Sequence, residues 1–328
     1  MLQNKINNDP PKISILVPLY NVEKYVERCL RSIINQTFQE FEIIVVDDFS
    51  SDKSLEIVKN LALKDKRIRV FAHTENQGLM YVRRLGIVNA RGEYIFFCDS
   101  DDYIPKDALQ SLYQEAVIKD SDIVVGDYVF VKNNGKEIYH HRSRKCGKTP
   151  NEMKKNILKD CKCTLWGNLY NKRIFNSDLQ FFEHQSISED RILITQLLDN
   201  CSSLSSVSKP TYYYYQNSSS LTQTKVSDIK TLSQLKAWDW LLNYYKDNSE
   251  LHTLAKHFIL RYLLYGIESG WNRELFSQFS FVNNLINFSN IQKMHNFHKS
   301  VHFYLCTKSR GYSRGTHSIR KFIQRIKH

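Results

Sequence analysis

The chain has 328 residues, of which 42% are hydrophobic and 24% charged, as is ordinary for a soluble globular protein of one or two domains. Its seven cysteines do not form a zinc-site pattern, so we expect reduced thiols in a cytosolic protein. The formal net charge is +12, but no Asp or Glu follows Glu274, so the basic excess describes the tail and does not indicate nucleic-acid binding.

The N-terminal residues 1–11 are polar, and we expect them to be disordered. They contain no apolar stretch typical of a signal peptide, and the sequence has no run of about 20 apolar residues that could span a membrane. We therefore expect a cytoplasmic protein.

Short apolar runs alternate with segments of helical periodicity from Lys12 to Val131. The predicted strands cover 12–19, 41–46, 68–72, 94–98 and 122–131, and the predicted helices cover 22–36, 53–64, 79–90 and 105–119. This alternation predicts parallel pairing through right-handed crossovers in a doubly wound α/β sheet. Ligands of such sheets bind at the carboxyl ends of the strands, where Tyr20, Asp48 and Asp99 fall.

The connection after the first predicted strand distinguishes this sheet from common nucleotide-binding folds. It contains neither the G-x-G-x-x-G fingerprint of dinucleotide sites nor the G-x-x-x-x-G-K-[ST] pattern of a P-loop. A nucleotide bound here must therefore be held by side chains and a metal.

Three carboxylates, Asp99, Asp101 and Asp102, follow the predicted strand 94–98. Two carboxylates about 5 Å apart repel by roughly 3 kcal/mol at an effective dielectric near 20, a cost that a divalent cation removes. Mg²⁺ and Mn²⁺ typically take one or two carboxylates and complete their shell with water and phosphate oxygens, so the pattern suggests a metal that holds a diphosphate. The alternative is that these residues form a loop and cap the next predicted helix, which begins at Pro105.

Several short motifs follow one another along the chain. They lie in Ile15–Asn21 (ILVPLYN), Ser32–Phe38, Ile43–Ser50, Asn76–Gly78, Ala90–Ile95, Asp99–Asp102 (DSDD), Leu165–Tyr170 and Ser188–Arg191 (SEDR). Together they resemble the family 2 glycosyltransferases of the GT-A fold over roughly two thirds of the chain. The resemblance implies a mostly parallel α/β sheet flanked by helices, here with a helical C-terminal extension.

The family implies an inverting, metal-dependent transfer of a hexose-type sugar. The donor would be a UDP-sugar, the cofactor Mn²⁺ or Mg²⁺, and the acceptor a growing bacterial surface glycan or a lipid-linked sugar. A non-catalytic nucleotide-sugar-binding partner subunit is an alternative, but it would have no need of Asp190. A sugar-1-phosphate nucleotidyltransferase is another, but Leu19–Val22 lacks the glycine-rich phosphate loop expected after its first strand.

The resemblance assigns donor-side roles by position. Pro18 and Tyr20 match residues that line the nucleoside, Asp48 matches the carboxylate that reads the base, and Arg83 matches an arginine that faces the diphosphate. The sequence departs from the family beside this arginine, because Arg84 stands where Asn is usual.

The same resemblance assigns the metal site. Asp99 and Asp101 match the D-x-D motif, with Asp101 as the direct metal ligand, and Ser100 between them is expected on the donor side.

The acceptor side is expected at two later motifs. Asp190 matches the base that takes the acceptor proton, with Glu189 positioning the acceptor, although Ser188 could equally make this pair the first turn of a helix. Trp166 and Gly167 are expected to bind the acceptor, the alternative for Trp166 being a place in the core.

These patterns divide the chain into an N-terminus (1–11), a glycosyltransferase domain (12–224, with a nucleotide-sugar half 12–131 and an acceptor half 132–224) and a basic helical region (225–328). The last segment, 318–328, is a basic amphipathic helix that could lie on the cytoplasmic face of an anionic bilayer or be a solvated terminus. A homodimer is left open.

Overall fold

The computed structural model describes residues 10–159, 164–185, 187–217, 227–268, 271 and 273–285. The chain forms two compact units, Met1–Thr224 and Lys225–His328. The predictions for residues 1–9, for Cys161 and Cys163, and for the amphipathic segment 318–328 lie outside the described residues.

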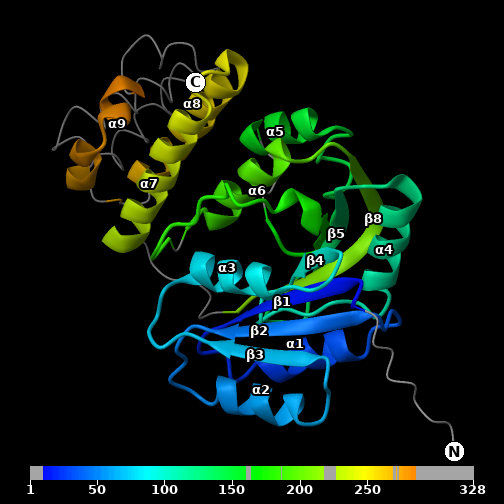
Figure 1. The fold of residues 1–328 in the computed structure, drawn as a ribbon. Coiled ribbons are helices and arrows are strands. Elements are labelled where there is room, and N and C mark those ends of the chain that lie inside the picture. The colour runs from blue at the N-terminus through cyan, green and yellow to red at the C-terminus, as the bar shows by residue number, and fades with distance from the viewer. Residues whose placement is uncertain are drawn as a thin grey trace, which may run out of the picture. The chain divides into compact units, whose positions relative to one another are not determined.

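The first unit is built on one mixed sheet, shown in Figure 1. Its strand order is β3-β2-β1-β4-β7-β5-β6, and β8 pairs with β5. The strands are β1 (Ile13–Leu19), β2 (Phe41–Asp47), β3 (Ile68–Ala72), β4 (Tyr94–Phe97), β5 (Ile123–Val131), β6 (Glu137–His140), β7 (Asn168–Asn171) and β8 (Leu204–Tyr215).

The half of the sheet formed by β3, β2, β1 and β4 is parallel throughout, as the sequence predicts. Its crossover helices are α1 (Val26–Ile34), α2 (Ser54–Ala62) and α3 (Leu79–Asn89), and α4 (Ala108–Lys119) follows β4. Strand boundaries agree closely with the predicted ones, whereas α1 and α4 begin later than predicted. The α/β fold class is confirmed.

The prediction of parallel pairing is wrong for β5. Strand β7 lies between β4 and β5 and is antiparallel to both, and β6 forms an antiparallel hairpin with β5. Two antiparallel steps restore the original direction, so β5 still runs parallel to β4 without pairing with it. A four-residue strand such as β7 has no periodicity that could be recognised in sequence.

Helices cover both faces of the parallel half (Figure 1). The odd-numbered residues of β1, from Ile13 to Leu19, belong to the core that α1, α2 and α4 cover. On the opposite face Leu16 packs against Gly86 of α3, where a Cβ would lie 3.3 Å from the Leu16 methyl carbons. The alternation follows from the two-residue period of a strand.

The motif Ala90–Ile95 has a structural role at the start of β4. The Gly92 N–H donates to Ser14 Oγ (2.8 Å), and Ser14 Oγ and the Arg91 N–H both donate to Glu42 Oε1 (2.7 Å each). A Cβ on Gly92 would lie 2.5 Å from the Ser14 nitrogen, so only glycine allows this approach. The motif thereby aligns β4 with β1 and β2.

The later helices complete both units. In the first unit α5 (Pro150–Lys159) contacts α6 (Glu189–Asp199), and η1 (Lys172–Ile174) follows β7. The second unit contains α7 (Asp228–Tyr244), α8 (Ser249–Glu268), η2 (Arg273–Gln278) and α9 (Ser280–Leu285). Among the described residues, no helix combines the length and the apolar character needed to cross a bilayer.

The close packing of β5 on β8 can be tested at Gly126. The substitution Gly126→Ala places a methyl group 2.0 Å from Thr211 Oγ1, beside an irregularity in the β5–β8 register. We expect the free energy of unfolding to fall by about 1–3 kcal/mol because this site is overpacked. Urea unfolding followed by circular dichroism measures the change.

Gly135→Asn is the matched control. Gly135 has φ +78°, a Cβ at this position would have no neighbouring atom within 4 Å, and Asn tolerates this backbone conformation. An unchanged midpoint for Gly126→Ala would contradict the packing of β5 on β8.

Candidate functional site

The carboxyl ends of β1, β2 and β4 meet at one edge of the sheet. The Asp48 N–H donates to the Leu19 carbonyl (2.9 Å), and the Cys98 N–H donates to the Leu16 carbonyl (3.0 Å). Tyr20, which is 50% exposed, therefore lies at the same edge as Asp48 and Asp99. Pro18 lies near the end of β1 and is half-buried.

A buried guanidinium joins residues from both predicted sides of the site. Arg83, on α3, is 3% exposed, and its Nη1 lies 2.6 Å from Asp190 Oδ1 and 3.5 Å from Glu189 Oε1. Its Nη2 lies 3.5 Å from Asp99 Oδ1. One cation thus faces three carboxylates, two of them at the start of α6 and one after β4.

The charge imbalance of this cluster appears in its proton affinities. Burial raises the pKa of Asp99 to about 7, an effect that Arg83 opposes and that the negative charges of Asp190 and Asp101 reinforce. Burial and the charge of Asp190 raise the pKa of Glu189 to about 8. Burial alone would lower the pKa of Arg83, but the three carboxylates raise it, so the guanidinium stays charged. Because the cluster contains three carboxyl groups and one guanidinium, it can accommodate a further cation.

Both acidic residues of the SEDR motif stand in the first turn of α6, and their side chains are only 13% and 16% exposed. Asp190 also accepts from the Leu165 N–H through Oδ2 (3.2 Å). Ser188 occupies the N-cap position with φ +64°, but its side chain makes no capping hydrogen bond. Asp190 is therefore positioned by Arg83 and Leu165 and not by a capping box.

The D-x-D loop is anchored by a residue that the sequence did not single out. Tyr212 of β8 is fully buried; its hydroxyl accepts from the Asp99 N–H (2.9 Å) and donates to Asp102 Oδ2 (2.8 Å). Asp102 Oδ1 accepts from the Tyr215 N–H (2.7 Å). Asp102 is fully buried and serves the fold, whereas Asp99 and Asp101 keep part of their surface exposed.

A second support holds Asp101. Arg28 of α1 donates through Nη2 to the Asp101 carbonyl (2.6 Å), and its guanidinium lies 4.2 Å from the ring centroid of Tyr215 and 4.8 Å from that of Tyr103. Asn217 Nδ2 lies 3.4 Å from Asp101 Oδ2. These contacts join residues far apart in the chain, so no local sequence pattern could have indicated them.

The acidic loop fits a divalent cation whose coordination shell is completed by a bound ligand. In the described part of the chain, Asp99 Oδ1 is buried and accepts no hydrogen bond, and its contact with Arg83 Nη2 is a long one of 3.5 Å, so this oxygen can also serve a metal. Burial also raises the pKa of Asp101. No cluster of three or more His, Cys, Asp or Glu among the described residues could hold a metal by itself. Two carboxylates are nevertheless sufficient for Mg²⁺ or Mn²⁺ when phosphate oxygens complete the shell.

Ser100 lies between the two candidate metal ligands and is 6% exposed. Asp48 is 4% exposed, and its carboxylate accepts from the Gln77 and Gly78 N–H groups (2.9 Å each) and contacts His73 Nδ1 (2.9 Å). These bonds hold the N-terminus of α3, which carries Arg83. The recognition of the nucleotide base by Asp48 stays a prediction. The contacts of its carboxylate in the structure are with protein groups.

The structure places Trp166 in the core, which corrects our expectation of an acceptor-stacking face. The ring is 4% exposed, stacks on Tyr212 (4.4 Å between centroids, 15°), and has the Arg142 guanidinium 5.0 Å from its centroid. Gly167 is needed for close packing, since its φ is +71° and a Cβ would lie 2.8 Å from Tyr212 Cβ. Neither residue offers an open surface to a sugar.

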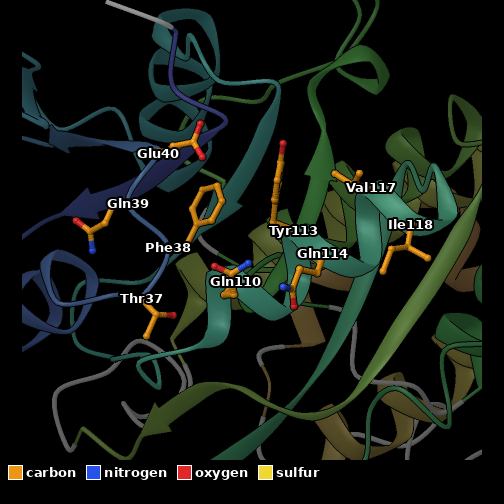
Figure 2. A pocket seen from close by; sticks show the side chains of 9 residues that line it. All are labelled: Thr37, Phe38, Gln39, Glu40, Gln110, Tyr113, Gln114, Val117 and Ile118. Atoms are coloured by element: carbon orange, nitrogen blue, oxygen red, sulfur yellow. The ribbon is translucent and has the colours of Figure 1, made fainter. Parts of the chain in front are cut away.

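A pocket of about 450 Å³ lies at the opposite edge of the sheet, between the residues that precede β2 and helix α4 (Figure 2). It contains none of the predicted site residues. Its lining residues are Thr37, Phe38, Gln39, Glu40, Gln110, Tyr113, Gln114, Val117 and Ile118.

Comparison with known proteins relates this chain to one family. The family model described as Glycosyl transferase family 2 matches residues 14–176. Glycosyltransferase GlyA of Streptococcus pneumoniae is 43% identical over 130 residues, which cover 40% of this chain and 18% of that protein. The uncharacterized glycosyltransferase EpsJ of Bacillus subtilis is 34% identical over 221 residues, which cover 65% of this chain and 63% of that protein. The matched segments thus span less than two thirds of these relatives.

Among solved structures, S. aureus TarS (residues 1–349), crystallised in complex with UDP-GlcNAc, aligns with a TM-score of 0.69. The sequences are 22% identical, and the alignment covers 94% of this chain and 92% of that chain. At this identity the likeness concerns the fold, and it confirms the predicted GT-A architecture.

The buried cluster predicts a pH dependence of stability. Because folding raises the pKa of Glu189 from 4.5 to about 8, its protonation stabilises the fold at low pH, and this contribution is lost as the pH rises to about 8. Glu189→Gln cannot titrate, so we expect it to gain stability relative to wild type between about pH 5 and pH 8. At most one proton is involved, so the slope of the unfolding free energy changes by no more than about 1.4 kcal/mol per pH unit.

Urea unfolding across this pH range measures the effect. Glu93→Gln is the control, because Glu93 is half-exposed and pairs only with Lys12 at 3.6 Å in the described salt bridges. Parallel stability curves for wild type and Glu189→Gln would contradict the raised pKa of Glu189.

Proposed function

Because the chain belongs to glycosyltransferase family 2, we propose that it transfers a hexose-type sugar from a UDP-sugar to a glycan or lipid-linked acceptor with inversion. The observation that carries this proposal is the contact of one guanidinium with Asp99 on the donor side and with Asp190 on the acceptor side. Inverting transfer needs charge stabilisation at the leaving diphosphate and a base at the acceptor within one site. The TarS complex with UDP-GlcNAc supports a UDP-sugar as donor.

On the donor side, Arg83 supplies a charge that does not depend on pH. The leaving diphosphate gains negative charge as the glycosidic bond breaks, so a fixed cation stabilises the transition state more than the ground state. Asp99 and Asp101 would hold Mn²⁺ or Mg²⁺, which supplies further neutralisation of this charge when bound. Pro18 lies near the end of β1 and the exposed Tyr20 follows it, which supports a role of both residues in contacting the nucleoside.

On the acceptor side, Asp190 accepts the hydroxyl proton while the acceptor oxygen forms its bond to the anomeric carbon. Arg83 and the Leu165 N–H orient its carboxylate. Glu189, whose pKa is raised to about 8, is protonated near neutral pH and can donate a hydrogen bond to the acceptor. The two neighbouring carboxyl groups would thus carry different roles because their environments differ.

Two substitutions separate donor binding from catalysis. For Asp190→Asn we expect UDP binding to persist while the hydrolysis of UDP-hexose falls by roughly 10²–10⁴-fold, as for loss of a general base. For Asp101→Asn we expect UDP binding in the presence of Mn²⁺ to weaken. Calorimetry with UDP and Mn²⁺ measures binding, and UDP release from a panel of UDP-hexoses measures turnover.

Asp107→Asn is the control, because Asp107 lies beside α4, is 56% exposed and pairs with Lys209. If wild type and all three variants bound UDP but released none from UDP-hexose, the chain would be a nucleotide-sugar-binding subunit without catalysis. Equal and measurable rates of release would contradict the roles of Asp101 and Asp190.

We also propose that the basic C-terminal residues 318–328 bring the protein to the cytoplasmic face of the membrane. Each cation near an anionic surface contributes about 1 kcal/mol, so Gln at Arg320, Lys321, Arg325 and Lys327 should weaken binding to phosphatidylglycerol vesicles. Co-sedimentation of this variant and of a chain that ends at Arg310 would measure it. If wild type and both variants co-sedimented with the vesicles to the same extent, the proposed membrane contact would be wrong.

A further inference from the structure

A run of basic residues lies between strand β6 and the end of helix α5. Residues 143–159, here called the basic segment, run from the loop after β6 to the end of α5. The segment contains six basic residues and one acidic residue. The basic residues are Arg144, Lys145, Lys148, Lys154, Lys155 and Lys159, and the acidic one is Glu152.

The beginning of this segment is tied to residues that border Asp190. The side chain of Arg142, which directly precedes the segment and is 5% exposed, donates to Thr164 Oγ1 (2.7 Å) and to the Gly167 carbonyl (3.1 Å). Between these two residues, the Leu165 N–H donates to Asp190 Oδ2. The chain therefore leaves the neighbourhood of the candidate base and enters the basic segment directly.

The end of the segment is tied to the same place. Arg191, the residue after Asp190, donates through Nη1 to the Ile157 carbonyl in the last turn of α5 (2.7 Å). Both ends of the segment are thus tied by hydrogen bonds to residues that contact Asp190 or follow it in the sequence.

Hydrogen bonds hold the backbone of the segment against helix α5. Asn156 Nδ2 donates to the Lys145 carbonyl (3.1 Å), which fixes the loop against α5. Glu152 Oε2 accepts from the Lys148 N–H (2.7 Å), and the Glu152 N–H donates to Thr149 Oγ1 (3.2 Å), as in a capping arrangement. The one acidic side chain of the segment is therefore used at the helix start.

Three of the cations are well placed to meet a ligand. Arg144, Lys145 and Lys148 are exposed, whereas Lys154 pairs with Asp199. The opposite, donor end of the site is acidic, with Asp99 and Asp101. The candidate base Asp190 and its neighbour Glu189 are acidic as well, so positive charge for an anionic acceptor comes from the exposed side chains of the basic segment.

From this arrangement we infer that the acceptor carries phosphate groups, as in a polyol-phosphate chain, and that the basic segment binds them. The inference rests on the proposed function, since it concerns the acceptor of that reaction. Trp166, the aromatic residue expected to stack on a neutral sugar, is buried in the core, so charge is the recognisable feature of this side. The interaction would be long-ranged and weakened by salt.

Charge reversal in the full-length chain tests the inference. The test variant carries Glu at Arg144, Lys145 and Lys148. The matched control carries Glu at Lys59, Lys64 and Lys66, which are equally exposed but lie on α2 and the loop after it. Fluorescence anisotropy with a labelled glycerol-phosphate oligomer and with a neutral glucan oligomer measures binding at two salt concentrations, and release of UDP from UDP-hexose without acceptor shows that the donor site is intact.

We expect wild type to bind the glycerol-phosphate oligomer more tightly than the glucan, with an affinity that falls with salt. The test variant should lose roughly tenfold or more in affinity while the control variant changes little, and both should hydrolyse the donor like wild type. Equal losses in the two variants, or a preference of wild type for the glucan, would overturn the inference.

A further arm distinguishes a membrane from an acceptor. If the test variant loses binding to phosphatidylglycerol vesicles but keeps its affinity for the glycerol-phosphate oligomer, the segment serves a lipid surface and the inference is wrong. Absence of donor hydrolysis in wild type would instead count against the proposed function, so the two failures are distinguishable.

Discussion

The site depends on a single buried cation. Arg83 is almost fully removed from solvent, and a buried guanidinium is tolerated only where anions and hydrogen bonds compensate for its lost hydration. Its compensation comes from Asp99, Glu189 and Asp190, which belong to two segments far apart in the sequence. Separating the start of α6 from α3 would remove the 2.6 Å contact of Arg83 with Asp190, and breaking a buried ion pair typically costs about 3–5 kcal/mol. The same cation opposes the rise in the pKa of Asp99 and Glu189 that burial causes.

The fold brings Arg83 to this place through Asp48. By accepting from the Gln77 and Gly78 N–H groups, Asp48 ties the end of β2 to the start of α3. Gly78 has φ +90°, and a Cβ there would lie 3.3 Å from His184 Cα, while the His184 N–H donates to the Gln77 carbonyl (3.2 Å). The loop that leads to Asp190 thus rests on the turn that begins the arginine helix. Arg83 and Asp190 are thus positioned by one continuous set of contacts.

Local pattern predicted the parallel half of the sheet well, because apolar runs and helical periodicity are properties of neighbouring residues. It also predicted that Asp99 follows a strand and that Asp190 stands in the first turn of a helix, as the structure shows. It could not find Arg28 or Tyr212, whose roles come from contacts with residues more than 70 positions away in the sequence. Residue type alone misplaced Trp166, because a tryptophan beside a glycine suits a core and a sugar pocket equally well. The short strand β7 was missed for lack of any periodicity.

A crystal structure of the full-length protein with UDP and Mn²⁺ would test the central claim most directly. The diphosphate should lie within hydrogen-bonding distance of Arg83, with the metal between its oxygens and the carboxylates of Asp99 and Asp101. Asp190 should face the open side of the same cavity. A diphosphate bound elsewhere, for example in the pocket beside Tyr113, or an Arg83 that contacts only protein groups and lies far from the nucleotide, would contradict it.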